Sequence, residues 1–179
     1  MSLLPLFLVI ACAAASAHCQ GTTPSSHRLV GVPFARQERD NWCGPAALAS
    51  VLGYYGHPLR QEEIAKQLYF GDEGALNLDL KLFTRKLGFA ASSGPGQLCY
   101  LRHTVASGVP VICQVRRKQF LRRYFHYLVV YGYDDRRRVF YAHAGTAADQ
   151  VISYRDFYYD WSQAGRWMLV IKRGVSEEK

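Results

Sequence analysis

The spacing of hydrophobic residues changes near residue 109, and this change divides the chain into two parts. Before it, apolar positions recur every three or four residues, which is typical of amphipathic helices. After it, apolar and aromatic residues form short runs separated by turn residues, which is typical of strands. The predicted helices span 44–56, 60–68, 78–87 and 96–101, and the predicted strands span 109–115, 124–133, 138–142, 150–153 and 167–172, with a loop or short helix over 154–162. This order predicts an α+β fold in which N-terminal helices pack on a C-terminal antiparallel sheet.

The helix predicted at 44–56 has clear start and stop signals. Ala and Leu dominate it and favour helix, Pro45 suits the first turn, and Gly56 suits the C-terminal cap. Ala47 and Val51 repeat at helical spacing, so one face of the helix is expected to be buried. A polar loop precedes the helix, and Cys43 therefore lies directly at its N-terminus.

The N-terminal segment predicts export. Residues 3–15 are apolar, and Ala15-Ser16-Ala17 has the small-x-small pattern that signal peptidase accepts. The run is shorter than the roughly 20 apolar residues that a membrane-spanning helix needs. We interpret 1–20 as a signal peptide, 21–31 as a linker, 32–173 as the folded domain and 174–179 as a C-terminal tail. The expected location is periplasmic or secreted.

Cys12 allows a second interpretation of the same segment. Val9-Ile10-Ala11-Cys12 resembles a lipobox, in which Cys12 would become the lipidated first residue of an outer-membrane lipoprotein. That lipid would attach the protein to a membrane. A plain signal peptide with an incidental Cys12 is the alternative, and the sequence leaves both open.

Composition and charge fit one globular domain with a basic surface. Of 179 residues, 49% are hydrophobic and 20% charged, which is enough apolar material for a real core. The net charge is +8, and much of it comes from residues 116–123 and 136–138. Such clusters attract anionic partners, although a solvated rim that keeps the protein soluble is the simpler alternative. No nucleic-acid-binding motif accompanies the charge, so a nucleic acid partner is not expected.

Three cysteines remain outside the predicted signal peptide: Cys43, Cys99 and Cys113. If Cys99 and Cys113 pair, Cys43 is left as the free thiol. Two buried thiols are the equal alternative, because geometry decides pairing. No metal and no cofactor are expected.

Cys43 has the local surroundings of a nucleophile. The positive end of a helix dipole favours the thiolate, which is the attacking form. Gly44 leaves room for a substrate carbonyl, and the first N–H groups of the helix can hold an oxyanion. The alternative is a buried structural cysteine.

Two further side chains complete the candidate site. Gln37, six residues before Cys43, carries an amide N–H that can donate to an oxyanion. His126 begins an otherwise apolar strand, where its ring nitrogens need partners. The alternatives are an ordinary surface glutamine and a core histidine that the backbone satisfies.

These residues together resemble the C39-type peptidases, papain-like domains that process bacteriocin leader peptides, and their stand-alone relatives. The resemblance rests on Gln37, Cys43-Gly44-Pro45-Ala46-Ala47 and His126-Tyr127-x-Val129-Val130-x-Gly132, and it extends from Val32 to Lys172. It implies a papain-like fold, a peptide or protein substrate, and a Cys/His/Asp triad with Gln37 in the oxyanion hole.

The chain departs from that family at the third member of the triad. The place of the family's Asp-Pro falls on Ala142-His143-Ala144-Gly145, which contains no carboxylate. His143 is the predicted replacement, orienting His126 through a ring nitrogen; an exposed loop histidine is the alternative. We therefore expect a cysteine peptidase that works through a Cys43 thioester, with a non-catalytic C39-like peptide-binding module as the second hypothesis.

Overall fold

The computed structural model describes residues 23–174, except 69, 72–73 and 120–121. The predicted signal peptide, the Cys12 lipobox and nearly all of the C-terminal tail lie outside the described residues. Within them, no helix combines the length and the apolar character needed to cross a membrane.

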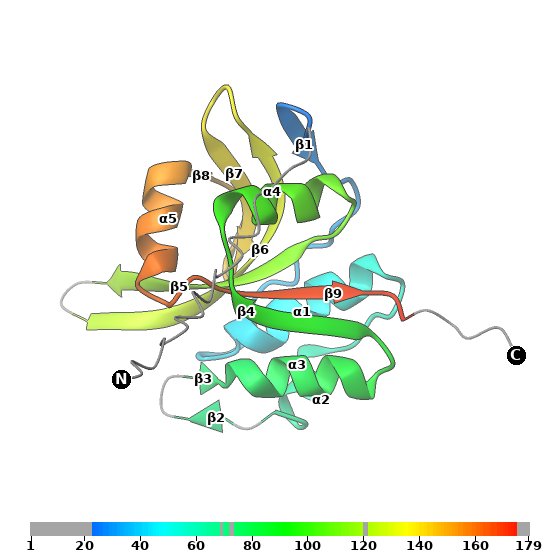
Figure 1. The fold of residues 1–179 in the computed structure, drawn as a ribbon. Helices are drawn as coiled ribbons and strands as arrows, with labels where there is room; N and C mark the ends of the chain where they lie inside the picture. Colours follow the sequence, from blue (N-terminus) through cyan, green and yellow to red (C-terminus); the bar gives the residue numbers. More distant parts are fainter. Residues whose placement is uncertain (1–22, 69, 72–73, 120–121, 175–179) are drawn as a thin grey trace, which may run out of the picture.

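A seven-stranded antiparallel sheet forms the centre of the molecule (Figure 1). Six strands follow the order β4-β9-β5-β6-β7-β8, and β1 pairs with the C-terminal end of β6. The strands are β1 (Ser26–Arg28), β4 (Ala90–Pro95), β5 (Val111–Gln119), β6 (Arg122–Asp134), β7 (Val139–Ala144), β8 (Ala147–Ser153) and β9 (Trp167–Lys172). A separate small hairpin joins β2 (Phe70–Gly71) and β3 (Gly74–Ala75).

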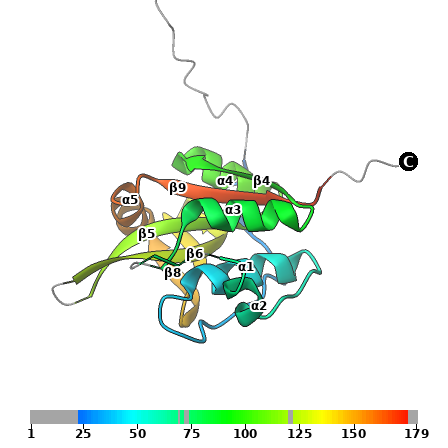
Figure 2. The same ribbon diagram turned by 90° about the horizontal axis from the view of Figure 1, so that it is seen from below.

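Helices cover both faces of this sheet (Figure 2). They are α1 (Cys43–Tyr54), α2 (Gln61–Ala65), α3 (Asn77–Lys86), α4 (Leu98–Ala106) and α5 (Tyr154–Ser162). Apolar residues of α1, α2 and α3 form one buried cluster with the sheet, and those of α4 and α5 form another. Alternation along β5 supplies both clusters, because Ile112 faces α1 while Val111 and Cys113 face the opposite way. The predicted α+β architecture is confirmed.

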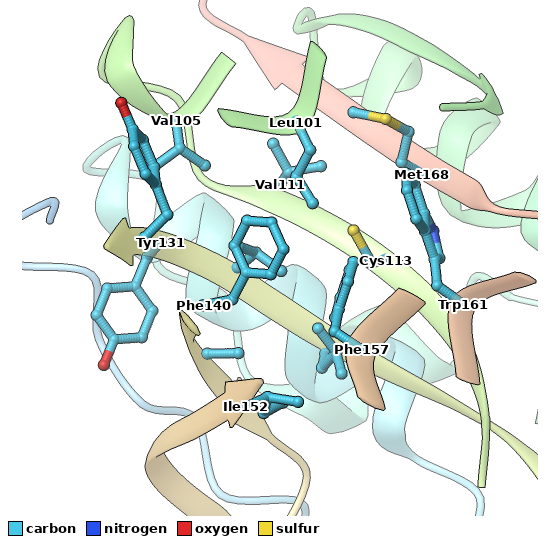
Figure 3. Close-up of a cluster of buried hydrophobic side chains, with 14 of the residues drawn as sticks. Leu101, Val105, Val111, Cys113, Tyr131, Phe140, Ile152, Phe157, Trp161 and Met168 are labelled. Atoms are coloured by element: carbon cyan, nitrogen blue, oxygen red, sulfur yellow. The ribbon is translucent and has the colours of Figure 1, made fainter. Parts of the chain in front are cut away.

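The cluster under α4 and α5 contains the larger aromatic side chains (Figure 3). Phe157 and Trp161 of α5 gather there with Phe140, and all are almost completely buried. Cys113 lies among them as a free thiol with no exposed surface. Cys113 is therefore not paired with Cys99.

The structure differs from the sequence prediction at two strands of the sheet, β1 and β4. Ser26–Arg28, expected within a linker, pair with Gly132–Asp134 of β6, and the following Leu29 is buried. The linker prediction is wrong for this stretch. Edge strand β4 was not predicted, because its Ala, Ser and Gly residues have weak strand preference.

Residues 154–162 form helix α5, for which the Ser153 side chain accepts a capping bond from the Asp156 N–H at 3.1 Å.

Candidate active site

Cys43 is the first residue of α1 and only 5% of it is exposed. The chain turns just before it, with Asn41 at a positive φ of 63°. The first helical hydrogen bond runs from the Ala46 N–H to the Trp42 carbonyl at 2.9 Å. The helix therefore begins one residue earlier than predicted and places Cys43 in its first turn.

Three backbone N–H groups approach the Cys43 sulfur: those of Cys43 itself, Gly44 and Tyr127. Burial raises the pKa of the thiol, and these donors lower it by a smaller amount, so the pKa of Cys43 is raised. This reverses the expectation that the helix N-terminus would favour the thiolate. Burial outweighs the backbone donors, and the resting side chain is a thiol.

Gly44 has a packing role in addition to leaving room for a substrate. A Cβ built at Gly44 would lie 3.1 Å from the Ala75 Cβ and 3.5 Å from the Leu80 Cδ1. Any larger residue would push α1 away from β3 and α3. The glycine therefore helps to fix the position of the Cys43 sulfur.

His126 lies at the open edge of β6, next to the turn between β7 and β8. A Cβ built at Gly145, where φ is +56°, would lie 2.6 Å from the His126 Cε1 and 3.1 Å from the Gln37 Oε1. The backbone N–H of Gln37 donates to the Gly145 carbonyl at 2.9 Å. The imidazole and the amide thus meet against the backbone of one glycine.

The Cys43 sulfur reaches the same edge. Side chains alternate along β6, so His126 shares a face with its partner Val115 rather than with Tyr127. The sulfur, however, is contacted by the Tyr127 N–H, which lies in the plane of the sheet. The sulfur therefore lies near β6 at Tyr127, the residue after His126. Within the described part of the chain, no hydrogen bond joins the sulfur to the imidazole.

The Gln37 amide is partly engaged in its own loop. Its Nε2 donates to the Arg39 carbonyl at 2.8 Å. An amide nitrogen carries two hydrogens, so one N–H remains for a second acceptor. The loop is in turn held by Gln61, whose Nε2 donates to the Arg36 carbonyl at 2.6 Å.

Burial lowers the pKa of His126 to about 4, and the positive charge of Arg117 adds a smaller lowering. The imidazole is therefore neutral at neutral pH. A neutral thiol beside a neutral imidazole requires His126 to act as a general base during the reaction. A pre-formed thiolate–imidazolium pair does not fit these pKa directions.

His143 does not have the position predicted for it. Only 6% of it is exposed, and its ring stacks on Tyr131 at 4.5 Å between centroids. Its Nε2 donates to the Val32 carbonyl at 3.1 Å, and its Nδ1 accepts from the Asp149 N–H at 3.3 Å. Both nitrogens are therefore used, and none is left to orient His126. The alternative of an exposed loop histidine is also wrong.

The structure adds two backbone groups that sequence reasoning missed: the Tyr127 N–H and the whole of Gly145. A backbone group is the same in every residue, so the sequence gives no sign of the Tyr127 N–H. The glycine at 145, in the turn between β7 and β8, was the only available signal for the second group. Within the described part of the chain, no three His, Cys, Asp or Glu residues are grouped so as to hold a metal ion.

Solved structures with this architecture are papain-like peptidases. The peptidase domain of Streptococcus ComA superposes with a TM-score of 0.64 at 22% identity, covering 79% of this chain and 98% of its own. A Bacillus anthracis protein assigned as a C39-like peptidase gives 0.70 at 19% identity, covering 83% and 98%. Xylellain, a cysteine protease from Xylella fastidiosa, gives 0.61 at 13% identity, covering 85% and 87%.

These likenesses define the fold as papain-like. Residues 29–168 match the Peptidase_C39 like family, and the chain belongs to that family. Among curated protein sequences, none matches the chain.

Proposed function

We propose that the chain is a cysteine peptidase in which Cys43 attacks, His126 is the base and Gln37 helps to hold the oxyanion. One observation supports the proposal most: His126 and Gln37, from separate segments, both lie beside Gly145. The backbone N–H of Tyr127, the residue after His126, lies close enough to the Cys43 thiol to lower its pKa. Family membership supports the same chemistry. The substrate is a peptide or a protein.

The proposed reaction begins when His126 takes the Cys43 proton as the sulfur attacks a peptide carbonyl. The developing oxyanion accepts bonds from the free N–H of Gln37 and from the backbone N–H of Cys43. Collapse breaks the C–N bond, and the leaving amine takes the proton from His126. Water then hydrolyses the thioester with His126 again as base.

The missing carboxylate predicts slow turnover. A triad carboxylate holds the base in one tautomer and stabilises the imidazolium that forms. In this chain the packing of His126 against Gly145 supplies the orientation. Among the described residues the charge that acts on His126 is that of Arg117, which disfavours the imidazolium. We expect real but weak activity.

The second candidate is a peptide-binding module without catalysis. The raised pKa of Cys43 and the engagement of both His143 nitrogens favour it. It would use the same edge of β6 to hold a polypeptide without cutting it.

A peptide-library digest with the full chain separates the two candidates. The wild type should produce new termini that are absent with Cys43→Ala and strongly reduced with His126→Ala. Equal digestion by the wild type and Cys43→Ala, or none by either, would overturn the peptidase. Iodoacetamide labelling across pH adds an independent readout, because alkylation of Cys43 should slow in His126→Ala.

Export remains part of the proposal, with either a cleaved signal peptide or a lipid on Cys12. Cell fractionation and the mass of the mature N-terminus test it. A full-length, unmodified cytoplasmic chain would contradict both routes.

A further inference from the structure

Strands β5 and β6 continue beyond the rest of the sheet as a two-stranded ribbon (Figures 1 and 2). On one side, β9 pairs with β5 only at Val111–Cys113. On the other, β7 pairs with β6 only from Leu128 onward. Beyond these points, the described residues of the two strands pair only with each other.

One face of this ribbon carries a row of cations. Residues in register across an antiparallel pair share a face, and the pairs here are Arg116 with Phe125 and Lys118 with Arg123. The next pair on that face is Gln114 with Tyr127, and Tyr127 packs in the same buried cluster as Cys43. We call Arg116, Lys118 and Arg123 the cation row; in register it follows Tyr127, and its long side chains also reach α5, where they line a cavity with Tyr159, Asp160 and Gln163.

No acidic side chain of the described chain pairs with the cation row. The sequence contains no Asp or Glu between Asp79 and Asp134. Asp160 of α5 pairs with Arg117, on the other face of the ribbon, at 3.0 Å. Lys118 and Arg123 lie directly opposite each other, an arrangement that is destabilising for like charges.

Arg116 carries a further unmet requirement. Its Nε is buried and has no hydrogen-bond partner among the described residues, while its guanidinium lies 5.3 Å from the centre of the Phe125 ring. A buried donor without an acceptor is costly. That Nε is closed to other molecules, whereas Lys118 and Arg123 are exposed and can meet an acceptor from outside the chain.

A small cavity beside the row limits what that acceptor is. Its volume is about 60 Å³, and it is lined by Arg116, Lys118, Arg123, Tyr159, Asp160 and Gln163. A space of this kind holds a few water molecules, because about 10–15 Å³ of such volume is enough for one, and a carboxylate is small enough to enter it. The Asp160 carboxylate at its wall is already neutralised by Arg117.

We propose that the cation row binds an acidic stretch of the polypeptide that Cys43 cuts. The inference rests on the proposed function and deepens it by naming the substrate class. Arg123 shares a face of β6 with Tyr127, whose backbone N–H lies near the Cys43 thiol. The four residues between them correspond to about 13 Å at about 3.3 Å per residue. Glu or Asp residues about four positions from the cut bond would therefore reach the row.

Binding is measured on the full chain carrying Cys43→Ala, so that peptide is not consumed. Fluorescent peptides of equal length carry three Glu, three Gln or three Lys at one end or the other. The Glu peptide should bind about tenfold more tightly than the Gln peptide, and added salt should erase the difference. Arg116→Gln/Lys118→Gln/Arg123→Gln should remove the preference, whereas Arg136→Gln/Arg137→Gln/Arg138→Gln, an equal charge change at the far turn, should keep it.

Charge reversal guards against a folding defect. Lys118→Glu/Arg123→Glu should invert the preference and favour the Lys peptide, which a misfolded protein would not do. Equal affinity for Glu and Gln peptides overturns the inference. A second outcome also overturns it. The triple Gln variant of the cation row would lose binding to vesicles containing an anionic phospholipid, or to a DNA oligonucleotide, and would still prefer the Glu peptide.

Turnover of the neutral peptide by the wild type tests the peptidase separately. A Glu preference without turnover upholds the binding row and overturns the peptidase. Turnover of both peptides at equal kcat/KM upholds the peptidase and overturns the row.

Discussion

The surroundings of Cys43 and Cys113 differ in kind, although both are free, buried thiols against the same sheet. Cys113 lies under α4 and α5 with no exposed surface, and burial alone raises its pKa. Cys43 lies in the other buried cluster, on the face covered by α1, α2 and α3. There, three backbone N–H groups oppose the effect of burial on its pKa. Burial by itself makes an inert thiol, and the backbone donors near Cys43 are the difference on which its proposed role as a nucleophile rests.

The sharpest test of this comparison removes each thiol in turn. Cys43→Ala should reduce peptide cleavage by roughly 10⁴-fold or more, to background, because no nucleophile remains. Cys113→Ala should keep kcat and lower the free energy of unfolding by about 1 kcal/mol, since a buried sulfur is lost. Cleavage assays and denaturant unfolding measure the two effects. Equal loss of activity in both variants would remove the distinction.

Gln37 should come next in size. Gln37→Glu keeps the shape of the side chain but removes the N–H donor, and it should lower kcat on the order of 10²–10³-fold. KM should change little, because the oxyanion forms only along the reaction. Gln150→Ala, at an exposed position on β8, is the control and should leave both constants unchanged. A change confined to KM would assign Gln37 to substrate binding instead.

Gly145 tests whether backbone packing replaces the missing carboxylate. Gly145→Ala places a methyl group 2.6 Å from the His126 Cε1, and displacing the ring should lower kcat about 10²-fold. Gly165→Ala is a matched control, because its φ of +65° is also positive and a Cβ there meets nothing within 4 Å. Both variants should lose similar stability in denaturant unfolding. If their activities also match, Gly145 has no positioning role.

The smallest effect concerns pH. A protonated His126 cannot accept the Cys43 proton, so activity should fall as pH drops through its folded pKa, about 4 instead of the usual 6.5. Arg117→Gln removes the positive charge and should move this acid limb of kcat/KM to higher pH. The limb should stay well below 6.5, because burial is the larger cause of the lowered pKa. Arg137→Gln, at the exposed far turn, should leave the limb in place. An acid limb near 6.5 in the wild type would contradict the burial of His126.

Much of the fold could be predicted because its signals are local. The strand at 167–172 and the start of α1 follow from apolar runs and from Pro45. Strand β1 could not be predicted, because its three residues, Ser26 to Arg28, are all polar and become a strand only when β6 lies beside them. The tertiary partner, and not propensity, determines such edge strands.

The candidate site divides in the same way. Gln37, Cys43 and His126 could be proposed from residue type and resemblance, and the structure places Gln37 and His126 together at Gly145. The role predicted for His143 is wrong, because the Val32 carbonyl, which is distant in sequence, and the Asp149 N–H, six residues away across the β7–β8 turn, engage its two nitrogens. The direction of the Cys43 pKa was also misjudged, since the helix dipole is local but burial is not.

The sequence alone determined the helix-then-sheet order, the position of Cys43 at a helix N-terminus and the excess of positive charge, because each depends on neighbouring residues. Tertiary structure decided which groups meet at the edge of β6, which nitrogens of His143 are already used and how far burial shifts each pKa. Those properties depend on distance and solvent exclusion among segments far apart in the chain, which no local pattern records.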